Sequence, residues 1–253
     1  MGGPGLKRIE LKSLKAQVVE ELERLVISGE LGIGAAFPPE RELARQLGVS
    51  RPIVHEAMVE LAAKGFARVE PRRGAKVADY YREGTLAIFE SIVLRGDGFF
   101  PVEVLEDLVA FRRLIEVEAV RLAAERGGGE LMRELEEIVA AEETLLAELA
   151  DAASAARRTE LDVRFHILLA EASGNRILPL VMRSVEPVYY KLVARFYAAR
   201  PDVAKVVAYH RSLLAAVASR KAGEAAAVAL AMLEHGAVEI AALSGGGRNG
   251  VRV

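Results

Sequence analysis

Residues 37–77 read FPPERELARQLGVSRPIVHEAMVELAAKGFARVEPRRGAKV, and this stretch decides the fold of the first third of the chain. It predicts a short helix that ends at Gly48, a tight turn, and a longer helix that has Ser50 as its N-cap. The longer helix ends at Gly65, and two short strands follow around a Pro-Arg-Arg-Gly turn. Upstream, residues 13–28 carry apolar side chains at helical spacing and predict a preceding helix.

This order of helix, short helix, tight turn, longer helix and hairpin is typical of a winged helix-turn-helix. The longer helix begins at Ser50 and Arg51, where free backbone N–H groups suit a phosphate and the first side chains suit base edges. Arg72 and Arg73 in the hairpin can reach the flanking DNA backbone or the minor groove. The stretch carries eight Lys and Arg against five Glu. A solvated basic turn between packed helices has the same pattern, so DNA binding is one of two interpretations at this point.

The 253 residues have a globular composition, with 52% hydrophobic and 28% charged residues. No apolar run reaches the roughly 18 residues of a membrane-spanning helix, and the N-terminal residues lack the apolar stretch of a secretory signal. We therefore expect a cytoplasmic protein. Cysteine is absent, so a metal site would use nitrogen and oxygen ligands only. Residues 1–80 have a net charge of +2 and the remainder −4, which weakly indicates a polyanionic partner for the head.

The rest of the chain predicts helices that glycine and proline interrupt. We expect seven of them, at 85–95, 101–127, 130–150, 156–173, 176–199, 202–220 and 223–243. The predicted fold is therefore mostly α, with an N-terminal winged helix-turn-helix and a C-terminal all-helical bundle of about seven helices. The predicted domains span 8–80 and 85–243, and we expect disorder at 1–7 and 244–253.

Three of the four histidines lie in the predicted bundle, each at an inward-facing position. His210 and His235 lie in apolar stripes of two different helices, and His166 follows Asp162 by one turn on a third helix. A single such histidine is usually a buried, hydrogen-bonded side chain, but three histidines with an aspartate favour a metal site. Three imidazoles and one carboxylate suit zinc, nickel, iron or manganese, and zinc is our first choice.

Arg112 interrupts a predicted buried stripe of apolar side chains in the helix at 101–127. A buried guanidinium needs an anionic partner, and its fork of N–H donors fits a carboxylate. One interpretation is an ion pair inside the protein, with Glu116 one turn further on. The other is a carboxylate ligand bound in a pocket, and the two interpretations are compatible.

The stretch 37–77 resembles the DNA-binding head of the GntR family of bacterial repressors, through its Pro-x-Glu-Arg-x-Leu-Ala helix, its Val-Ser-Arg turn and its Gly-containing wing. The resemblance implies DNA contacts from both central helices and the wing. In this chain the implied contacts are Arg41, Ser50, Arg51, His55, Arg72, Arg73 and Gly74. The family usually has arginine where this chain has His55, so one phosphate or guanine contact is expected to be weaker or read differently.

Three later segments, FRRLIEVEAVRLAAER, LDVRFHILLAEASGNRIL and YHRSLLAAV, resemble the FCD effector domain of the FadR-like branch of that family. Many members of the branch hold a divalent metal through an Asp-x-x-x-His pair and two later histidines. In this chain these residues are Asp162, His166, His210 and His235. The metal and a buried arginine then hold a small carboxylate effector, and we expect Arg112, Glu116 and Asn175 around it. The stretch ARFYAARPD also resembles acyl-CoA-binding members, which lack the full metal set.

The resemblance implies a ligand-responsive transcriptional regulator, expected to be a repressor, that binds a pseudo-palindromic DNA operator as a homodimer. Residues 8–80 would bind DNA, and residues 85–243 would bind the effector and dimerise. An acyl-CoA-responsive regulator and a sensor of the metal itself are the alternatives. A metal-dependent hydrolase is the rival class, but the sequence offers no separate general base on a recognisable motif, so we do not expect an enzyme.

Overall fold

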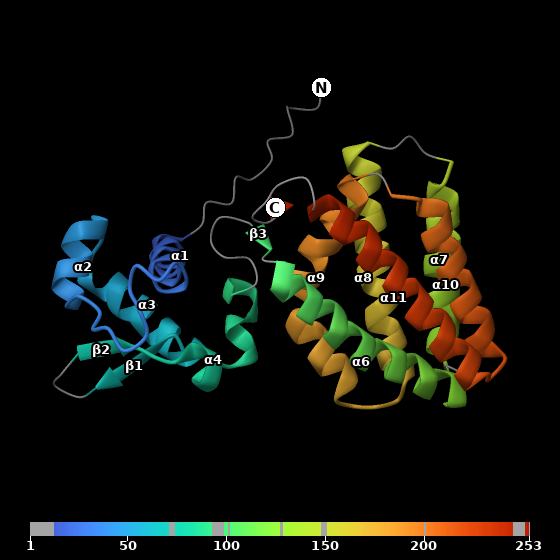
Figure 1. Cartoon of the computed structure of the whole chain (residues 1–253), viewed down its shortest axis with the longest axis horizontal. Coiled ribbons are helices and arrows are strands. Elements are labelled where there is room, and N and C mark those ends of the chain that lie inside the picture. The colour runs from blue at the N-terminus through green and yellow to red at the C-terminus, as the bar shows by residue number, and fades with distance from the viewer. Residues whose placement is uncertain are drawn as a thin grey trace, which may run out of the picture. The chain divides into compact units, whose positions relative to one another are not determined.

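The computed structural model describes residues 13–70, 74–92, 99–100, 102–126, 129–147, 151–199, 201–244 and 251–252. The chain divides into two compact units, Met1–Gly96 and Asp97–Val253. Figure 1 shows the helices and strands of both units. Each unit has a hydrophobic core of its own.

The first unit has the element order that the sequence predicts for a winged helix-turn-helix. Its elements are α1 (Leu14–Ile27), α2 (Glu40–Leu47), α3 (Arg51–Lys64), β1 (Ala67–Glu70), β2 (Gly74–Val77), α4 (Tyr80–Glu83) and η1 (Leu86–Ile88). The two strands pair antiparallel, with Ala67 opposite Val77 and Glu70 opposite Gly74. The mostly α fold with a winged head, predicted from the sequence, is confirmed.

Two glycines in the left-handed backbone region shape the ends of α2 and α3. Gly48, at φ +67°, ends α2 and allows the tight turn that leads into α3. Gly65, at φ +99°, ends α3, and a Cβ atom at this position would lie 2.7 Å from the Cα of Gly84. A side chain at Gly65 would therefore meet backbone atoms and also strain its own φ angle.

The core of the first unit joins α1, α3 and the chain that enters the hairpin. Leu22 of α1, Val54 and Leu61 of α3, and Phe66 are fully buried. Phe66 also packs against Tyr80, with the ring centroids 5.3 Å apart. Because these apolar side chains leave water together, the burial stabilises the orientation of α3 within the unit.

The second unit is an all-helical bundle, with six helices in the part of the chain that the structure describes. They are α6 (Val102–Arg126), α7 (Leu131–Leu145), α8 (Ala152–Ala172), α9 (Leu178–Ala198), α10 (Val203–Ala218) and α11 (Ala222–Ser244). Helix α6 packs against α8 and α11, and helix α7 packs against α8 and α10. The two-residue strands β3 (Phe99–Phe100) and β4 (Val251–Arg252) pair antiparallel.

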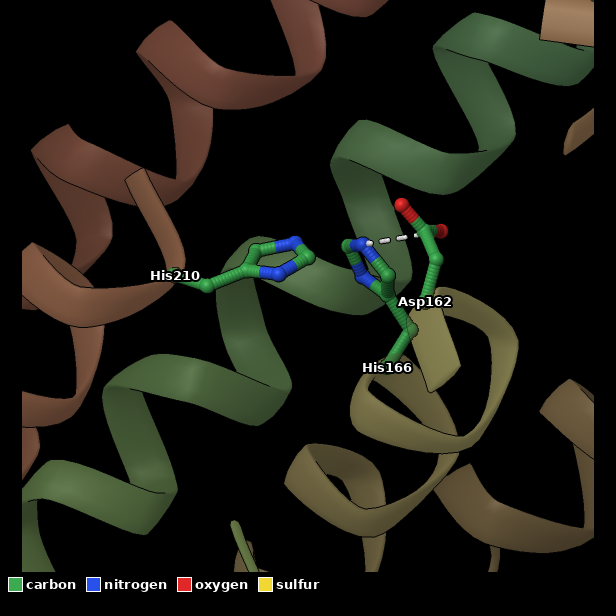
Figure 2. Close-up of side chains that lie close together, drawn as sticks. All are labelled: Asp162, His166 and His210. Carbon is green, nitrogen blue, oxygen red and sulfur yellow. Dashed lines mark ion pairs between the residues drawn. The ribbon is translucent and has the colours of Figure 1, made fainter. Parts of the chain in front are cut away.

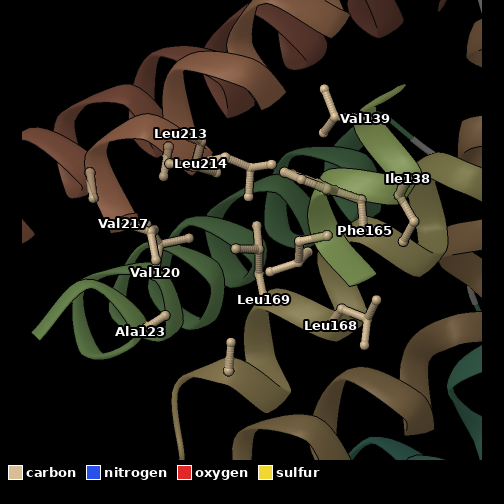
Figure 3. Close-up of a cluster of buried hydrophobic side chains, with 14 of the residues drawn as sticks. Val120, Ala123, Ile138, Val139, Phe165, Leu168, Leu169, Leu213, Leu214 and Val217 are labelled. Atoms are coloured by element: carbon tan, nitrogen blue, oxygen red, sulfur yellow. The ribbon is translucent and has the colours of Figure 1, made fainter. Parts of the chain in front are cut away.

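Figure 3 shows part of the core of this bundle. Ala123 of α6, Val139 of α7, Phe165 of α8 and Leu213 of α10 are all fully buried. Four helices thus share one close-packed core, which fixes α8 and α10 in place. These two helices carry His166 and His210, which are described below.

The boundary between the units differs from the prediction. The sequence predicts a bundle helix at 85–95, but this segment belongs to the first unit. Ile88 of η1 is buried in the core of that unit and Ile92 packs against the same core, so the described residues 85–92 belong to the core of the first unit.

The sequence predicts disorder at both ends of the chain, and the structure describes residues at the C-terminal end only. Residues 1–7 lie outside the described residues. In the range 244–253, Ser244 ends α11 and Val251–Arg252 form β4. The backbone of β4 pairs with β3, which gives these two residues a defined structure.

Candidate functional site

Asp162, His166 and His210 form a buried cluster in the second unit (Figure 2). Asp162 and His166 come from α8, and His210 comes from α10. Each residue offers one ligand atom, and these atoms all lie within 4.8 Å of one another. The three residues are only 6%, 5% and 0% exposed. A buried group of two imidazoles and a carboxylate suits a divalent transition-metal ion.

The beginning of α8 sets the position of two of these residues. Asp151 is the N-cap of the helix, and a capping box joins its side chain and backbone to Ser154. Asp162 and His166 are one turn apart, so they lie on the same face of the helix. Phe165, also on α8, stacks on the ring of His210 with the centroids 4.0 Å apart, which holds that imidazole beside α8.

Two further carboxylates hold the imidazoles of the cluster. Glu116 Oε2 lies 2.5 Å from His166 Nδ1. Glu142 Oε2 lies 2.8 Å from His210 Nδ1. An ionised carboxylate only accepts hydrogen bonds, so each Nδ1 carries the hydrogen and each Nε2 remains to bind another partner. A carboxylate on the ring nitrogen that does not bind the ion is the way in which proteins usually orient metal-binding histidines. His166 Nε2 lies 3.9 Å from Asp162 Oδ1.

These contacts shift two pKa values. Burial alone would raise the pKa of Glu116, but its charge interactions and hydrogen bonds with Arg112 and His166 outweigh burial and lower the pKa to about 2. Burial would lower the pKa of His210, but the charge and hydrogen bond of Glu142 outweigh burial and raise it. Glu116 is therefore ionised at neutral pH, and protons compete with a metal ion for His210 more strongly than they would for an imidazole in water.

His235, the fourth predicted ligand, lies on α11 and lines the same cavity as the cluster. Its Nε2 atom is buried and has no hydrogen-bond partner among the described residues, as is also true of His210 Nε2. His235 does not belong to the group of ligand atoms within 4.8 Å of one another. The structure thus brings three of the four predicted ligands together and places the fourth on the wall of their cavity.

The cluster opens onto a cavity of about 50 Å³. Two tyrosines of α9 hold the aspartate: the Tyr189 hydroxyl donates to Asp162 Oδ1 at 3.0 Å and the Tyr197 hydroxyl donates to Asp162 Oδ2 at 2.9 Å. Burial raises the pKa of both tyrosines well above the usual value, so their hydroxyl groups stay protonated and act as donors. Asp162 is therefore held through both of its oxygen atoms.

Arg112 forms an ion pair inside the protein and also lines the cavity. Its Nε donates to Glu116 Oε1 at 2.5 Å and its Nη2 donates to Glu116 Oε2 at 3.3 Å, which is the predicted ion pair within α6. Nη2 also donates to the Tyr189 hydroxyl at 2.9 Å. Arg112 lines the cavity as well. One connected network therefore runs from Arg112 through Glu116 to His166 and through Tyr189 to Asp162.

Asn175, the third residue predicted for the effector site, does not line this cavity. It lies in the turn between α8 and α9, where its Oδ1 accepts hydrogen bonds from the backbone N–H groups of Ile177 and Leu178. Asparagine commonly makes such turns by bonding the backbone two or three residues ahead. The structure therefore gives Asn175 a role in the turn that begins α9, and its place in the effector site stays a prediction.

The predicted DNA contacts of α3 lie at its exposed N-terminal end. Ser50 is the N-cap, and its side chain makes no capping hydrogen bond. The side chains of Arg51 and His55 are 71% and 64% exposed and lie one turn apart on α3. Arg41 at the start of α2 is also exposed, and Gly74 opens β2 at φ +89°. Arg72 and Arg73 lie outside the described residues.

Sequence reasoning missed four residues of these sites, and only one of them has a clear signal. Glu142 follows Leu135, Ile138 and Val139 at helical spacing in the buried stripe of α7, where an acidic residue is unusual. Tyr189 and Tyr197 have no comparable signal, because tyrosine is common in apolar stripes. Glu40 of α2, which contacts two residues of α3, is far from them in the sequence.

A winged helix-turn-helix head together with a helical domain that encloses a small cavity, lined by both apolar and ionisable side chains, has the architecture of a DNA-binding transcriptional regulator. Residues 14–77 match the family of bacterial regulatory proteins named gntR, and residues 107–236 match the FCD domain. The chain belongs to the GntR family and carries an FCD domain, so it is a transcriptional regulator and not an enzyme. No helix in the described part of the chain is long and apolar enough to cross a membrane.

Regulators from several bacteria are similar along most of the chain. The transcriptional repressor NanR of Klebsiella aerogenes is 32% identical over 212 residues, which are 83% of this chain and 76% of NanR. The regulator Mce2R of Mycobacterium tuberculosis is 28% identical over 214 residues, 85% of this chain and 86% of Mce2R. The match to the solved structure of Lar from Listeria monocytogenes covers 93% of this chain and 100% of the Lar chain. The TM-score is 0.62 and the sequence identity is 17%, which shows a shared fold.

Proposed function

We propose that this regulator binds one divalent metal ion per chain and uses it to hold a small carboxylate effector. The proposed ligands are Asp162, His166, His210 and His235. The observation that carries the proposal is that Nε2 of both His210 and His235 is buried without a hydrogen-bond partner among the described residues. A buried polar atom without a partner is unfavourable, and both nitrogen atoms would gain one as metal ligands.

The residues around the cluster fit this role. The ligand set is rich in nitrogen, which favours zinc as the first choice over nickel, iron and manganese. When bound, the ion supplies a Lewis acid to which a carboxylate oxygen can coordinate. Arg112 on the cavity wall offers N–H donors to the same carboxylate. Glu116 orients both Arg112 and His166, so it belongs to the proposed effector site as well.

The size of the cavity favours a small effector over an acyl-CoA. The cavity measures about 50 Å³, whereas drug-sized ligands occupy pockets of roughly 300–1,000 Å³. To hold an acyl-CoA, the cavity around the cluster would have to become several times larger in volume. A carboxylate of a few carbon atoms requires much less movement.

On the DNA side, we propose that a homodimer in the cytoplasm binds a pseudo-palindromic operator, because one winged head covers only a half-site. The proposed contacts are Arg41, Ser50, Arg51, His55, Arg72, Arg73 and Gly74. The exposure of Arg51 and His55 at the N-terminal end of α3 supports this assignment. We further propose that the protein represses transcription. NanR, one of the similar regulators, is named a repressor.

Metal analysis and melting curves test the metal site. We expect about one ion per chain in the purified protein, and its loss in His166→Ala and in His210→Ala. His55→Ala, a histidine change in the other unit, is the matched control and should keep the ion. If the wild type contains no metal and divalent ions leave its melting temperature unchanged, the histidines are structural and the proposal is wrong.

DNA binding at a fixed zinc concentration separates an effector sensor from a metal sensor. With a panel of two- to six-carbon carboxylates, we expect at least one to change operator affinity by about five- to 150-fold. If no carboxylate changes operator affinity at fixed zinc, and affinity instead follows the zinc concentration in a titration without carboxylate, the alternative in which the ion is the signal is favoured. A response only to long-chain acyl-CoA would favour the other alternative.

A further inference from the structure

Glu40, the first residue of α2, joins two residues of α3 that face outward. Its Oε2 accepts a hydrogen bond from Arg51 Nε at 3.2 Å, and its Oε1 lies 2.7 Å from His55 Nδ1. Glu40 is the more protected partner, with a side chain 28% exposed. The hydrogen bond from His55 lowers the pKa of Glu40, burial opposes this, and Arg51 adds to it, so the carboxylate is ionised at neutral pH.

This contact decides where the hydrogen of the neutral His55 ring lies. An ionised carboxylate oxygen cannot donate, so the hydrogen between Glu40 and His55 must be on Nδ1. A neutral imidazole carries only one ring hydrogen, and Nε2 is then a bare acceptor. Because Nδ1 is occupied by Glu40, Nε2 is the ring nitrogen of His55 that remains for another partner.

A side chain that accepts a hydrogen bond in the major groove pairs with different bases from a side chain that donates one. Adenine N6 and cytosine N4 are amino groups that donate there, whereas guanine presents the acceptors O6 and N7. Arginine has donors only and therefore suits guanine. A histidine whose Nε2 accepts a hydrogen bond prefers adenine or cytosine instead.

We propose that Glu40 holds His55 in the form whose Nε2 accepts a hydrogen bond, so that His55 selects a base with a major-groove amino group, adenine or cytosine. Arg51, one turn earlier on α3, keeps its donors and retains its preference for guanine. Glu40 is a positioning residue in this scheme, and His55 is the residue that determines specificity. The inference rests on the proposed DNA contacts of α3.

Selection of binding sites from random DNA at pH 8.5, which favours the neutral imidazole, tests the proposal with the full-length protein. The wild type should enrich a two-fold symmetric motif. The base position that loses its preference in His55→Ala is the position read by His55. At that position the wild type should prefer adenine or cytosine over guanine by about tenfold, and His55→Arg should prefer guanine.

Glu42, a second acidic residue of α2, provides a matched control for the proposed role of Glu40. Glu42 contacts Arg45 and Gln46 of the same helix. Glu40→Ala should lose most of the preference at the His55 position while it keeps the guanine at the Arg51 position. Glu42→Ala should keep both preferences. Melting curves of the two variants should agree within a few degrees, because the contacts of both residues are partly exposed.

The outcomes separate the inference from the proposed function. If the wild type enriches no motif, the proposed DNA contacts of α3 are wrong. If it enriches a motif but prefers guanine at the His55 position, or if His55→Ala changes no position, the inference about His55 is overturned. If Glu40→Ala and Glu42→Ala select the same motif as the wild type, Glu40 does not position His55.

Discussion

At the scale of single residues, Glu142 and Glu143 show how neighbouring glutamates of one helix can have different roles. Glu142 is buried and bonded to His210 Nδ1 at 2.8 Å. Glu143 is exposed and forms two hydrogen bonds to Arg211, at 2.9 and 2.6 Å. Removal of the charge at Glu142 should affect the proposed metal site, whereas removal of the charge at Glu143 should affect only a solvated pair.

We expect Glu142→Gln to weaken zinc binding by about 10- to 100-fold, because the side chain that orients His210 loses its charge. Glu143→Gln should bind zinc as the wild type does. Titration calorimetry at neutral pH, with zinc added to metal-free protein, gives both affinities. Melting curves of the metal-free variants show whether each one is folded. Equal affinities in the two variants would mean that Glu142 does not orient His210 for metal binding.

At the scale of helices and turns, two glycines with similar φ angles have different surroundings. Gly48 ends α2 in open space, with no atom within 4 Å of a Cβ built on it. Gly65 ends α3 against the backbone of Gly84. The first position therefore requires glycine only for its φ angle, while the second requires glycine for its φ angle and for space.

We expect Gly48→Ala to destabilise the first unit by about 1–2 kcal/mol, the cost of a left-handed conformation for alanine. Gly65→Ala should destabilise it by more, about 3 kcal/mol or above, because the new methyl group also displaces backbone. Urea unfolding followed by circular dichroism measures both changes. Similar values for the two variants would show that the chain around Gly84 moves aside easily.

The helices also show which parts of the structure could be predicted from the sequence. The head was predictable because glycines and caps mark the ends of α2 and α3 within the chain itself. The histidine cluster was predictable because helical spacing fixes which residues face inward. The assignment of 85–95 failed because apolar spacing at Ile88 and Ile92 shows that a segment is buried, but not which core buries it. The turn contacts of Asn175 could not be predicted, because a side chain that bonds a turn can have the same spacing in the sequence as one that binds a ligand.

At the scale of the whole molecule, the buried network around Glu116 makes the stability of the second unit depend on pH. In the folded protein the pKa of Glu116 is lowered from 4.5 to about 2. The ionised form therefore stabilises the fold above pH 4.5, and this contribution is lost as the pH falls from 4.5 to 2.

We expect the second unit to lose about 3 kcal/mol of unfolding free energy through Glu116 over that range of pH. Urea unfolding at pH 7, 4.5, 3 and 2 measures the loss, and metal-free protein avoids a contribution from metal release. Glu116→Gln should be less stable at pH 7 and should lose less between pH 4.5 and 3. A variant with the same acid dependence as the wild type would show that another carboxylate is responsible.

The tyrosines around the cavity have a practical consequence. The chain has six tyrosines and no tryptophan, so its intrinsic fluorescence comes from tyrosine alone. Tyr189 and Tyr209 line the cavity, and Tyr197 donates its hydroxyl hydrogen bond to Asp162. Half of the emitting side chains are therefore close to the histidine cluster. A paramagnetic ion such as Mn²⁺ or Ni²⁺ in the proposed site would quench their emission, while diamagnetic Zn²⁺ would not, so tyrosine fluorescence would distinguish the ions that could occupy this site.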